Sequence, residues 1–136
     1  MKYIVGEKLG MTQLVGEKGE IIPVTLIGAE ADFSPGDLVK VSARSTGKGF
    51  QGVVKRHGFA GSPASHGHHA VLRRPGSIGG RFPQRVLKGK RMGGRTGGQR
   101  VTVKNLKVIR VDAAHKVIAV RGAIPGKKGT RVEIRS

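Results

Sequence analysis

Short runs of β-branched residues alternate with polar positions in the N-terminal part of the chain. Because alternation with a period of two places apolar side chains on one face, such runs predict β-strands. The turn-like Gly16-Glu17-Lys18-Gly19 lies between two of the runs and predicts a strand pair. The runs are Lys2 to Val5, Thr12 to Val15, Glu20 to Ile27 and Asp37 to Val41.

Three further strands are predicted after residue 100. Val101 to Asp112 alternates except for a slip near Asn105, which a β-bulge would explain. Val117 to Arg121 and Arg131 to Arg135 complete the set. Six or seven short strands without a convincing long helix predict an all-β fold, either a barrel or a sandwich.

The middle of the chain lacks this alternation. From Ala43 to Arg100 it contains 14 of the 23 glycines and four of the five histidines, with few large apolar residues. Only Gly52 to Gly58 predicts a helical turn or two. Because burial cannot offset its ordering entropy, this stretch is expected to be irregular alone and to order on a partner. With 136 residues we expect one domain, with a barrel from 1–42 and 101–136 and an extension at 43–100.

The charge is concentrated in the same region. The chain has 26 Lys and Arg against 8 Asp and Glu, a formal charge of +18. Between Asp37 and Asp112 lie 74 residues without a carboxylate, which hold 17 of those Lys and Arg. Such a chain repels itself unless a polyanion neutralises it. Nucleic acid is the expected partner, because no basic amphipathic helix and no apolar run of roughly 20 residues indicates a membrane.

Several other classes of protein are not supported. The absence of cysteine excludes disulfides and thiolate metal sites. The N-terminal apolar stretch is broken at once by charge, so we expect no signal peptide and a cytoplasmic location. Without carboxylates in the basic region, general acid/base pairs are missing, and neither a Ser-His-Asp arrangement nor a P-loop is present. We therefore expect no enzyme activity, small-molecule substrate or cofactor.

The histidines His57, His66, His68 and His69 invite a metal hypothesis. Closed metal sites combine several ligands, and neither cysteine nor carboxylate is available near them. Contact with a base or phosphate is therefore the favoured interpretation.

Glycine adjoins Lys or Arg repeatedly in the same region, for example at Gly47-Lys48-Gly49 and Gly93-Gly94-Arg95. Glycine lets backbone approach phosphate closely while the basic side chains supply charge. A solvated, disordered segment is the alternative, although strands at both ends favour an anchored RNA-binding loop. Phe50, Phe59 and Phe82 either fold this loop or contact RNA, and the sequence leaves both roles open.

Several segments resemble the family of large-subunit ribosomal protein three, in order and spacing. The last of them, Gly122-Ala123-Ile124-Pro125-Gly126, lies near the C-terminus. The others are Gly6-x-Lys8-x-Gly10-Met11-Thr12-Gln13, Ile22-Pro23-Val24-Thr25, Gly47 to Phe59, Ser65-His66-Gly67, Arg73-Arg74-Pro75-Gly76-Ser77-Ile78-Gly79, Lys88-Gly89-Lys90-Arg91-Met92 and Arg100 to Leu106.

This resemblance implies a small, closed or partly closed β-barrel of the translation-factor type with a long irregular basic loop. It implies direct binding to large-subunit ribosomal RNA, a loop that reaches toward the peptidyl-transferase region, and a role in subunit assembly. By the same comparison Gly47 to Phe59 and Ser65 to Gly79 form the arms of the extension, and Arg81 to Arg100 its far and returning part.

The chain departs from the family pattern in three places. Only eight residues separate Ile27 from Gly36, where the family usually carries an inserted lobe, so this is a shortened form. Leu72 stands where a histidine is common, and Gly80 to Arg85 is shorter than usual.

The resulting hypothesis is a ribosomal protein located at a cytoplasmic or organellar ribosome, with large-subunit RNA and neighbouring large-subunit ribosomal proteins as partners. A stand-alone β-barrel RNA-binding protein or chaperone with non-specific affinity is the alternative. The predicted RNA-binding residues are Arg44, Lys48, Lys55, Arg56, His57, His66, His68, His69, Arg73, Arg74, Arg81, Arg85, Lys88, Lys90, Arg91, Arg95 and Arg100.

Overall fold

The computed structural model describes residues 2–30 and 32–136. The chain divides into two compact units, which we call the barrel unit, Met1–Thr46 with Gly98–Ser136, and the loop unit, Gly47–Gly97. The elements in chain order are β1 (Tyr3–Val15), β2 (Ile21–Gly28), β3 (Leu38–Arg44), β4 (Phe50–Gln51), α1 (Val53–His57), β5 (Gly94–Arg95), β6 (Arg100–Asp112), β7 (Val117–Arg121) and β8 (Arg131–Arg135).

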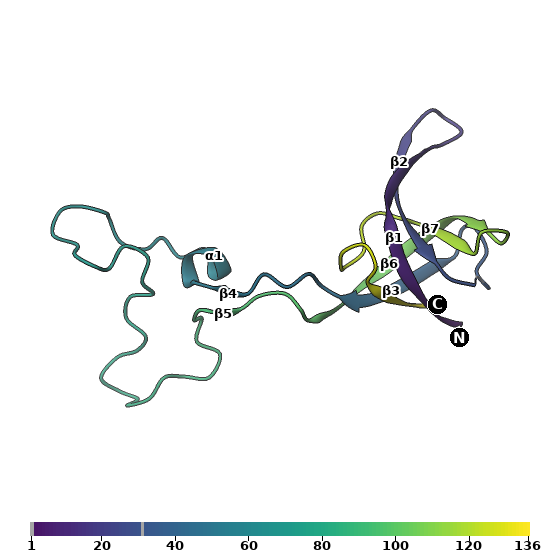
Figure 1. Cartoon of the computed structure of the whole chain (residues 1–136). Helices are drawn as coiled ribbons and strands as arrows, with labels where there is room; N and C mark the ends of the chain where they lie inside the picture. Colours follow the sequence, from purple (N-terminus) through teal and green to yellow (C-terminus); the bar gives the residue numbers. More distant parts are fainter. Residues whose placement is uncertain (1, 31) are drawn as a thin grey trace. The chain divides into compact units, whose positions relative to one another are not determined.

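Six antiparallel strands form the closed barrel in the order β1-β2-β7-β6-β3-β8, with β8 pairing back onto β1 (Figure 1). Every barrel strand therefore has two neighbours, and closure removes the unpaired edges that an open sheet would expose. The prediction of an all-β fold is confirmed, and of the two architectures left open by the alternation the barrel is the one observed.

The core lies inside this barrel and follows the alternation of its strands. On β8, Val132 and Ile134 are fully buried while Arg131 is exposed, as the period of two requires. The turn region between β2 and β3 contributes Phe33, and the loop before β8 contributes Ile124. The other buried members of the cluster are Ile27, Ala29, Val39, Val41, Ala43, Val108, Ile118 and Val120.

β1 corrects one prediction from the sequence. The runs Lys2 to Val5 and Thr12 to Val15, expected as separate strands, belong to one continuous strand. Gly6 continues the strand because it pairs with Val132 of β8. It lies so close to β2 that a Cβ atom would come 2.5 Å from the carbonyl oxygen of Gly28. Lys8 is buried and does not interrupt the strand. Its ammonium group donates to the carbonyl oxygens of Ile124 at 2.9 Å and Gly126 at 2.7 Å, so the buried charge is hydrogen-bonded.

β3 and β6 have different limits from those expected. β3 continues to Arg44 and β6 begins at Arg100, and these two residues are directly paired. The bulge predicted near Asn105 is confirmed, because the register between β3 and β6 shifts there and Asn105 has a φ of +58°. Ala43, Arg44 and Arg100, placed in the extension from the sequence, are therefore strand residues.

A short turn joins β6 to β7 and contains His115, the one histidine outside the loop unit. The backbone N–H of His115 donates to Asp112 at 3.2 Å, and its ring Nδ1 lies 2.9 Å from the same carboxylate. These hydrogen bonds lower the pKa of Asp112 below its ordinary value, and the bond to the His115 ring has the larger effect.

Candidate nucleic-acid interface

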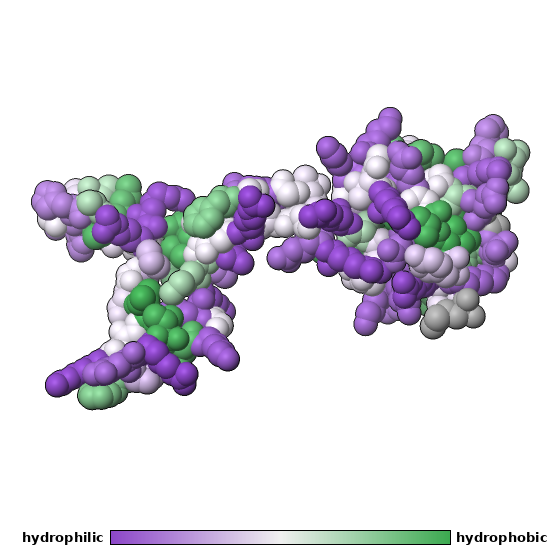
Figure 2. Space-filling view, turned by 60° about the horizontal axis from the view of Figure 1, so that its bottom comes forward, coloured by the Kyte–Doolittle hydropathy of each residue, from purple (hydrophilic) through white to green (hydrophobic). Residues whose placement is uncertain are grey.

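The loop unit carries uncompensated positive charge. Its 51 residues include eleven Lys and Arg and no Asp or Glu, so no ion pair can form within it. Val53 is its only buried residue, and all eleven Lys and Arg are exposed. Figure 2 shows hydrophilic side chains over much of the visible surface of this unit, with apolar patches between them. The unit therefore has many charges to offer a polyanion and almost no core of its own.

The base of the loop unit is held together by α1 and the β4–β5 pair. Phe50 pairs with Arg95 and Gln51 with Gly94, while Val53 is buried at the start of α1. The helical turn predicted between Gly52 and Gly58 is confirmed. Gly58 ends it in the left-handed conformation, with a φ of +72°, and its N–H bonds back to the helix.

Arg56 and His57 fasten this base. The guanidinium of Arg56 donates from Nη1 to the carbonyl oxygen of Met92 at 3.1 Å. Nε2 of the His57 ring lies 3.0 Å from the same oxygen. Gly94 makes the contact possible, since a Cβ atom there would come 2.2 Å from Arg56 Nη1. These two predicted RNA-binding residues thus have a structural contact as well, and His57 is only partly exposed.

Gly61 closes the next part of the loop unit onto itself. Its φ is +74°, and a Cβ atom would lie 2.4 Å from the carbonyl oxygen of Leu72, so only glycine fits. The N–H of Ser62 donates to that same carbonyl at 3.0 Å. Arg73 and Arg74 follow this closure directly, and both side chains are exposed.

His66, His68 and His69 lie within this closed segment, in a tight turn around Gly67. His66 has a φ of +60°, and the N–H of His69 donates to the Gly67 carbonyl at 3.0 Å. All three side chains are exposed to solvent. Within residues 2–30 and 32–136, no group of three or more His, Asp, Glu or Cys is arranged to hold a metal ion.

The remaining predicted residues of the loop unit are also solvent-exposed. Arg81 lies with its guanidinium carbon 5.8 Å from the ring centroid of Phe82, and that ring is itself 74% exposed. Gly89 has a φ of +80° between Lys88 and Lys90. The others in this exposed set are Lys48, Lys55, Arg85, Arg91 and Arg95.

Arg44 and Arg100 belong to the barrel unit and differ from the rest. Arg44 Nε donates to the carbonyl oxygen of Gly98 at 2.7 Å, and Arg100 forms an ion pair with Glu133 on β8. The structure also brings Arg131 next to Glu133 on the same strand, a residue that sequence reasoning did not select. The alternation along β8 places Arg131 outside the barrel, but it does not reveal which strands lie beside it.

No helix in the described residues is both long and apolar enough to span a membrane.

Comparisons with known proteins identify the family of this chain. Residues 5–119 match the family described as Ribosomal protein L3. Large ribosomal subunit protein uL3 of Streptomyces coelicolor is 54% identical over 205 aligned residues, covering 100% of this chain and 96% of that protein. Its counterpart in Shouchella clausii is 34% identical over 201, covering 99% and 97%. That of Cutibacterium acnes is 54% identical over 105, covering 76% of this chain and 47% of that protein.

The closed barrel with its basic loop unit, together with these matches, places the chain among the structural proteins of the ribosome. The chain belongs to the ribosomal protein L3 family. It is a shortened member, because its 136 residues align over 205 positions with the Streptomyces protein, which leaves at least 69 positions without a residue of this chain.

Proposed function

We propose that this chain is a structural constituent of the large ribosomal subunit that binds large-subunit ribosomal RNA directly through its loop unit. The observation that carries the proposal is the charge of that unit: eleven exposed Lys and Arg, no carboxylate and one buried residue. When Lys and Arg neutralise the phosphates of a polyphosphate, its bound counterions are released. This release supplies most of the binding free energy of such a surface. Membership of a ribosomal protein family supports ribosomal RNA as that polyphosphate.

The finer parts of the proposal concern where the loop unit binds. The glycines at Gly61, Gly89 and Gly94 let backbone turn sharply and pack closely, which suits a segment threaded between RNA helices. We propose that this unit reaches toward the peptidyl-transferase region, that it binds early enough to assist subunit assembly, and that the barrel unit contacts RNA and neighbouring large-subunit proteins. The location is then the cytoplasmic ribosome.

Binding of the full chain to large-subunit RNA is expected to weaken steeply with salt. If about half of the eleven Lys and Arg neutralise one phosphate each, the slope of log affinity against log salt is roughly −4. Affinity measured by filter binding between 50 and 400 mM KCl (about an eightfold range) checks this. A slope near zero would contradict the electrostatic proposal.

Copurification with large subunits at high salt would separate a ribosomal constituent from a stand-alone, non-specific RNA binder.

The exposed ring of Phe82 is expected to stack on an unpaired base of the RNA. Phe82 lies beside Arg81 and is 74% exposed, whereas Phe59 is partly buried with its ring centroid 6.1 Å from that of His57. Base stacking on an aromatic side chain contributes about 1–3 kcal/mol. Phe82→Ala should therefore lower affinity by roughly 5- to 150-fold without changing the salt slope, because no charge is removed.

Leu87→Ala is the matched control for Phe82→Ala. Leu87 is exposed in the same segment but has no π-face, so its truncation should leave RNA affinity nearly unchanged. Phe82→Trp should retain the affinity of the parent. Equal affinities of Phe82→Ala and the parent would show that the ring does not stack on RNA.

A further inference from the structure

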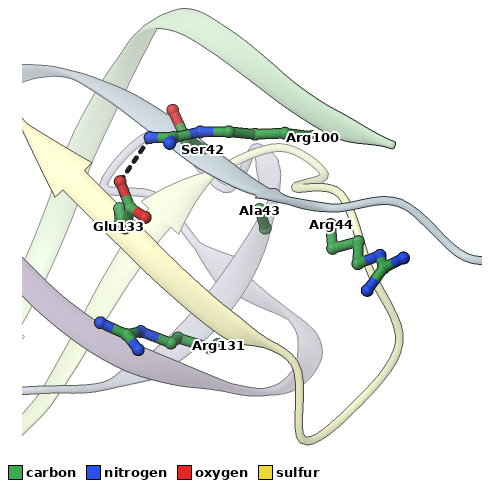
Figure 3. Close-up of a pocket in the computed structure, with 6 residues that line it drawn as sticks. All are labelled: Ser42, Ala43, Arg44, Arg100, Arg131 and Glu133. Atoms are coloured by element: carbon green, nitrogen blue, oxygen red, sulfur yellow. Dashed lines mark hydrogen bonds and ion pairs between the residues drawn. The ribbon is translucent and has the colours of Figure 1, made fainter. Parts of the chain in front are cut away.

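A pocket lies on the outside of the barrel where β3, β6 and β8 run side by side (Figure 3). Ser42 has a short side chain, so the outer surface is low at its position, and longer side chains surround it. The side chain of the neighbouring Ala43 belongs to the core cluster. Six residues line the pocket: Ser42, Ala43, Arg44, Arg100, Arg131 and Glu133.

Strand register explains why cations gather around this pocket. Arg44 of β3 is directly opposite Arg100 of β6, and Ser42 is directly opposite Glu133 of β8. Like charges directly opposite on neighbouring strands destabilise a sheet. Placing three arginines around one carboxylate leaves an excess of two positive charges at the pocket. Such an arrangement favours a further anion.

Glu133 is an internal anion that occupies part of this site. Its carboxylate oxygen Oε2 accepts from Arg100 Nη2, and Arg135 Nη2 lies 3.3 Å from the same oxygen. Figure 3 shows Glu133 between Arg100 and Arg131, with the Arg44 guanidinium directed away from it. One carboxylate is thus shared by two arginines and does not neutralise the group.

Among the three arginines that line the pocket, Arg131 is the one without a partner in the described part of the chain. Within the described part of the chain, no hydrogen bond or ion pair of its side chain is formed, and the residue is exposed. Glu7 of β1 is opposite Arg131 in the register, yet the two side chains do not form an ion pair. The Arg131 guanidinium therefore presents a free donor fork, whose planar geometry matches two oxygens of a phosphate.

We propose that this pocket binds a phosphate group of the RNA backbone, held by Arg131 and Arg100, with Glu133 as the competing internal anion. When phosphate enters, Arg100 exchanges its bond to Glu133 for one to phosphate. This gives the barrel unit an RNA contact of its own, separate from the loop unit. The inference rests on the proposed function and deepens it by naming the site and the ligand chemistry.

The test compares two variants of the full chain that change the pocket in opposite directions. Arg131→Gln should lower affinity for large-subunit RNA about five- to tenfold and reduce the magnitude of the salt slope by about 0.7–0.9, the value for one phosphate contact. Glu133→Gln should raise affinity several-fold, because it removes the competing anion. Arg121→Gln, an exposed arginine of β7 outside the pocket, is the matched control and should leave the slope unchanged.

Thermal melts of each variant verify that it is folded, and Arg131→Lys provides a second variant that keeps the charge but loses the fork. Partial loss in Arg131→Lys supports the proposal. Parent-like affinity in both Arg131→Gln and Glu133→Gln overturns it, as does weaker binding by a folded Glu133→Gln protein.

Free phosphate is the other source of the same chemistry. Titration with inorganic phosphate, followed by the amide NMR signals of Ala43 and Glu133, probes it directly. If phosphate shifts these signals while Arg131→Gln leaves RNA affinity unchanged, the pocket is a small-anion site and the assignment to RNA backbone is wrong. If a loop-unit variant loses RNA binding while the pocket variants do not, this inference fails and the proposed function stands. If neither set affects binding, both fail.

Discussion

Replacing Lys88, Lys90 and Arg91 together by Ala is expected to weaken binding to large-subunit RNA on the order of a hundredfold near physiological salt. If each side chain neutralises one phosphate, the variant loses three counterion-releasing contacts, and the salt slope should fall in magnitude by about 2–3. All three side chains are exposed, in a unit that contains no carboxylate to pair with them. Affinities measured across a salt series give both quantities.

The same triple replacement should leave the barrel unit unchanged. Its strands bury apolar residues such as Ile27 and Val120, and none of the three replaced residues belongs to that unit. Thermal unfolding and amide hydrogen exchange of β6 and β7 should therefore match the parent. Replacing Arg121, Lys127 and Lys128, which are exposed in the barrel unit, removes the same charge and is the matched control. Unfolding of the barrel, or equal RNA losses in the two triples, would contradict the assignment.

The strands were predictable where a single buried face repeats locally. On β8, the alternation of Val132 and Ile134 with charged residues directly encodes which side faces the core, and the structure agrees. On β1, the pattern is interrupted at Gly6 and Lys8, and the sequence indicated two strands instead of one. The buried ammonium group of Lys8 is satisfied by carbonyls more than one hundred positions away, which no local pattern reveals.

Two of the segments that carry the family resemblance contact each other in the barrel unit. The N-terminal Gly6-x-Lys8 motif holds the C-terminal loop, because Lys8 bonds to the carbonyls of Ile124 and Gly126. Two motifs recognised separately in the sequence are therefore one contact in the structure. Their role here is to position the loop before β8, whose outer face includes Arg131 and Glu133.

The basic region was predictable from composition, because an absence of carboxylates over 74 residues needs no structural information. The individual roles of its residues were not. Arg56 and His57 bond to the backbone of Met92, and Arg100 forms an ion pair with Glu133, so these three contribute to protein structure as well as charge. Such contacts join residues more than thirty positions apart in the chain, so no local pattern in the sequence reveals them.

Ile118→Ala is expected to lower the free energy of unfolding by about 2–5 kcal/mol, the range for truncating a buried isoleucine. Ile118 is 0% exposed on β7, where it pairs with Ile27 of β2 and Val111 of β6 at the centre of the barrel. Truncation removes transfer free energy and leaves a cavity that a closed barrel cannot easily collapse, because each strand is held on both sides.

Ile21→Ala is the matched control for Ile118→Ala, because the same chemical change is made on β2 at a residue that is 66% exposed. Its expected effect is within about 0.5 kcal/mol. Urea unfolding followed by circular dichroism measures both free energies, with equal slopes against urea expected if the denatured state is unchanged. At temperatures where the variant is folded, Ile118→Ala should bind RNA as the parent does, since the charges of the loop unit are intact. Equal stabilities of the two variants would contradict the core assigned to the barrel.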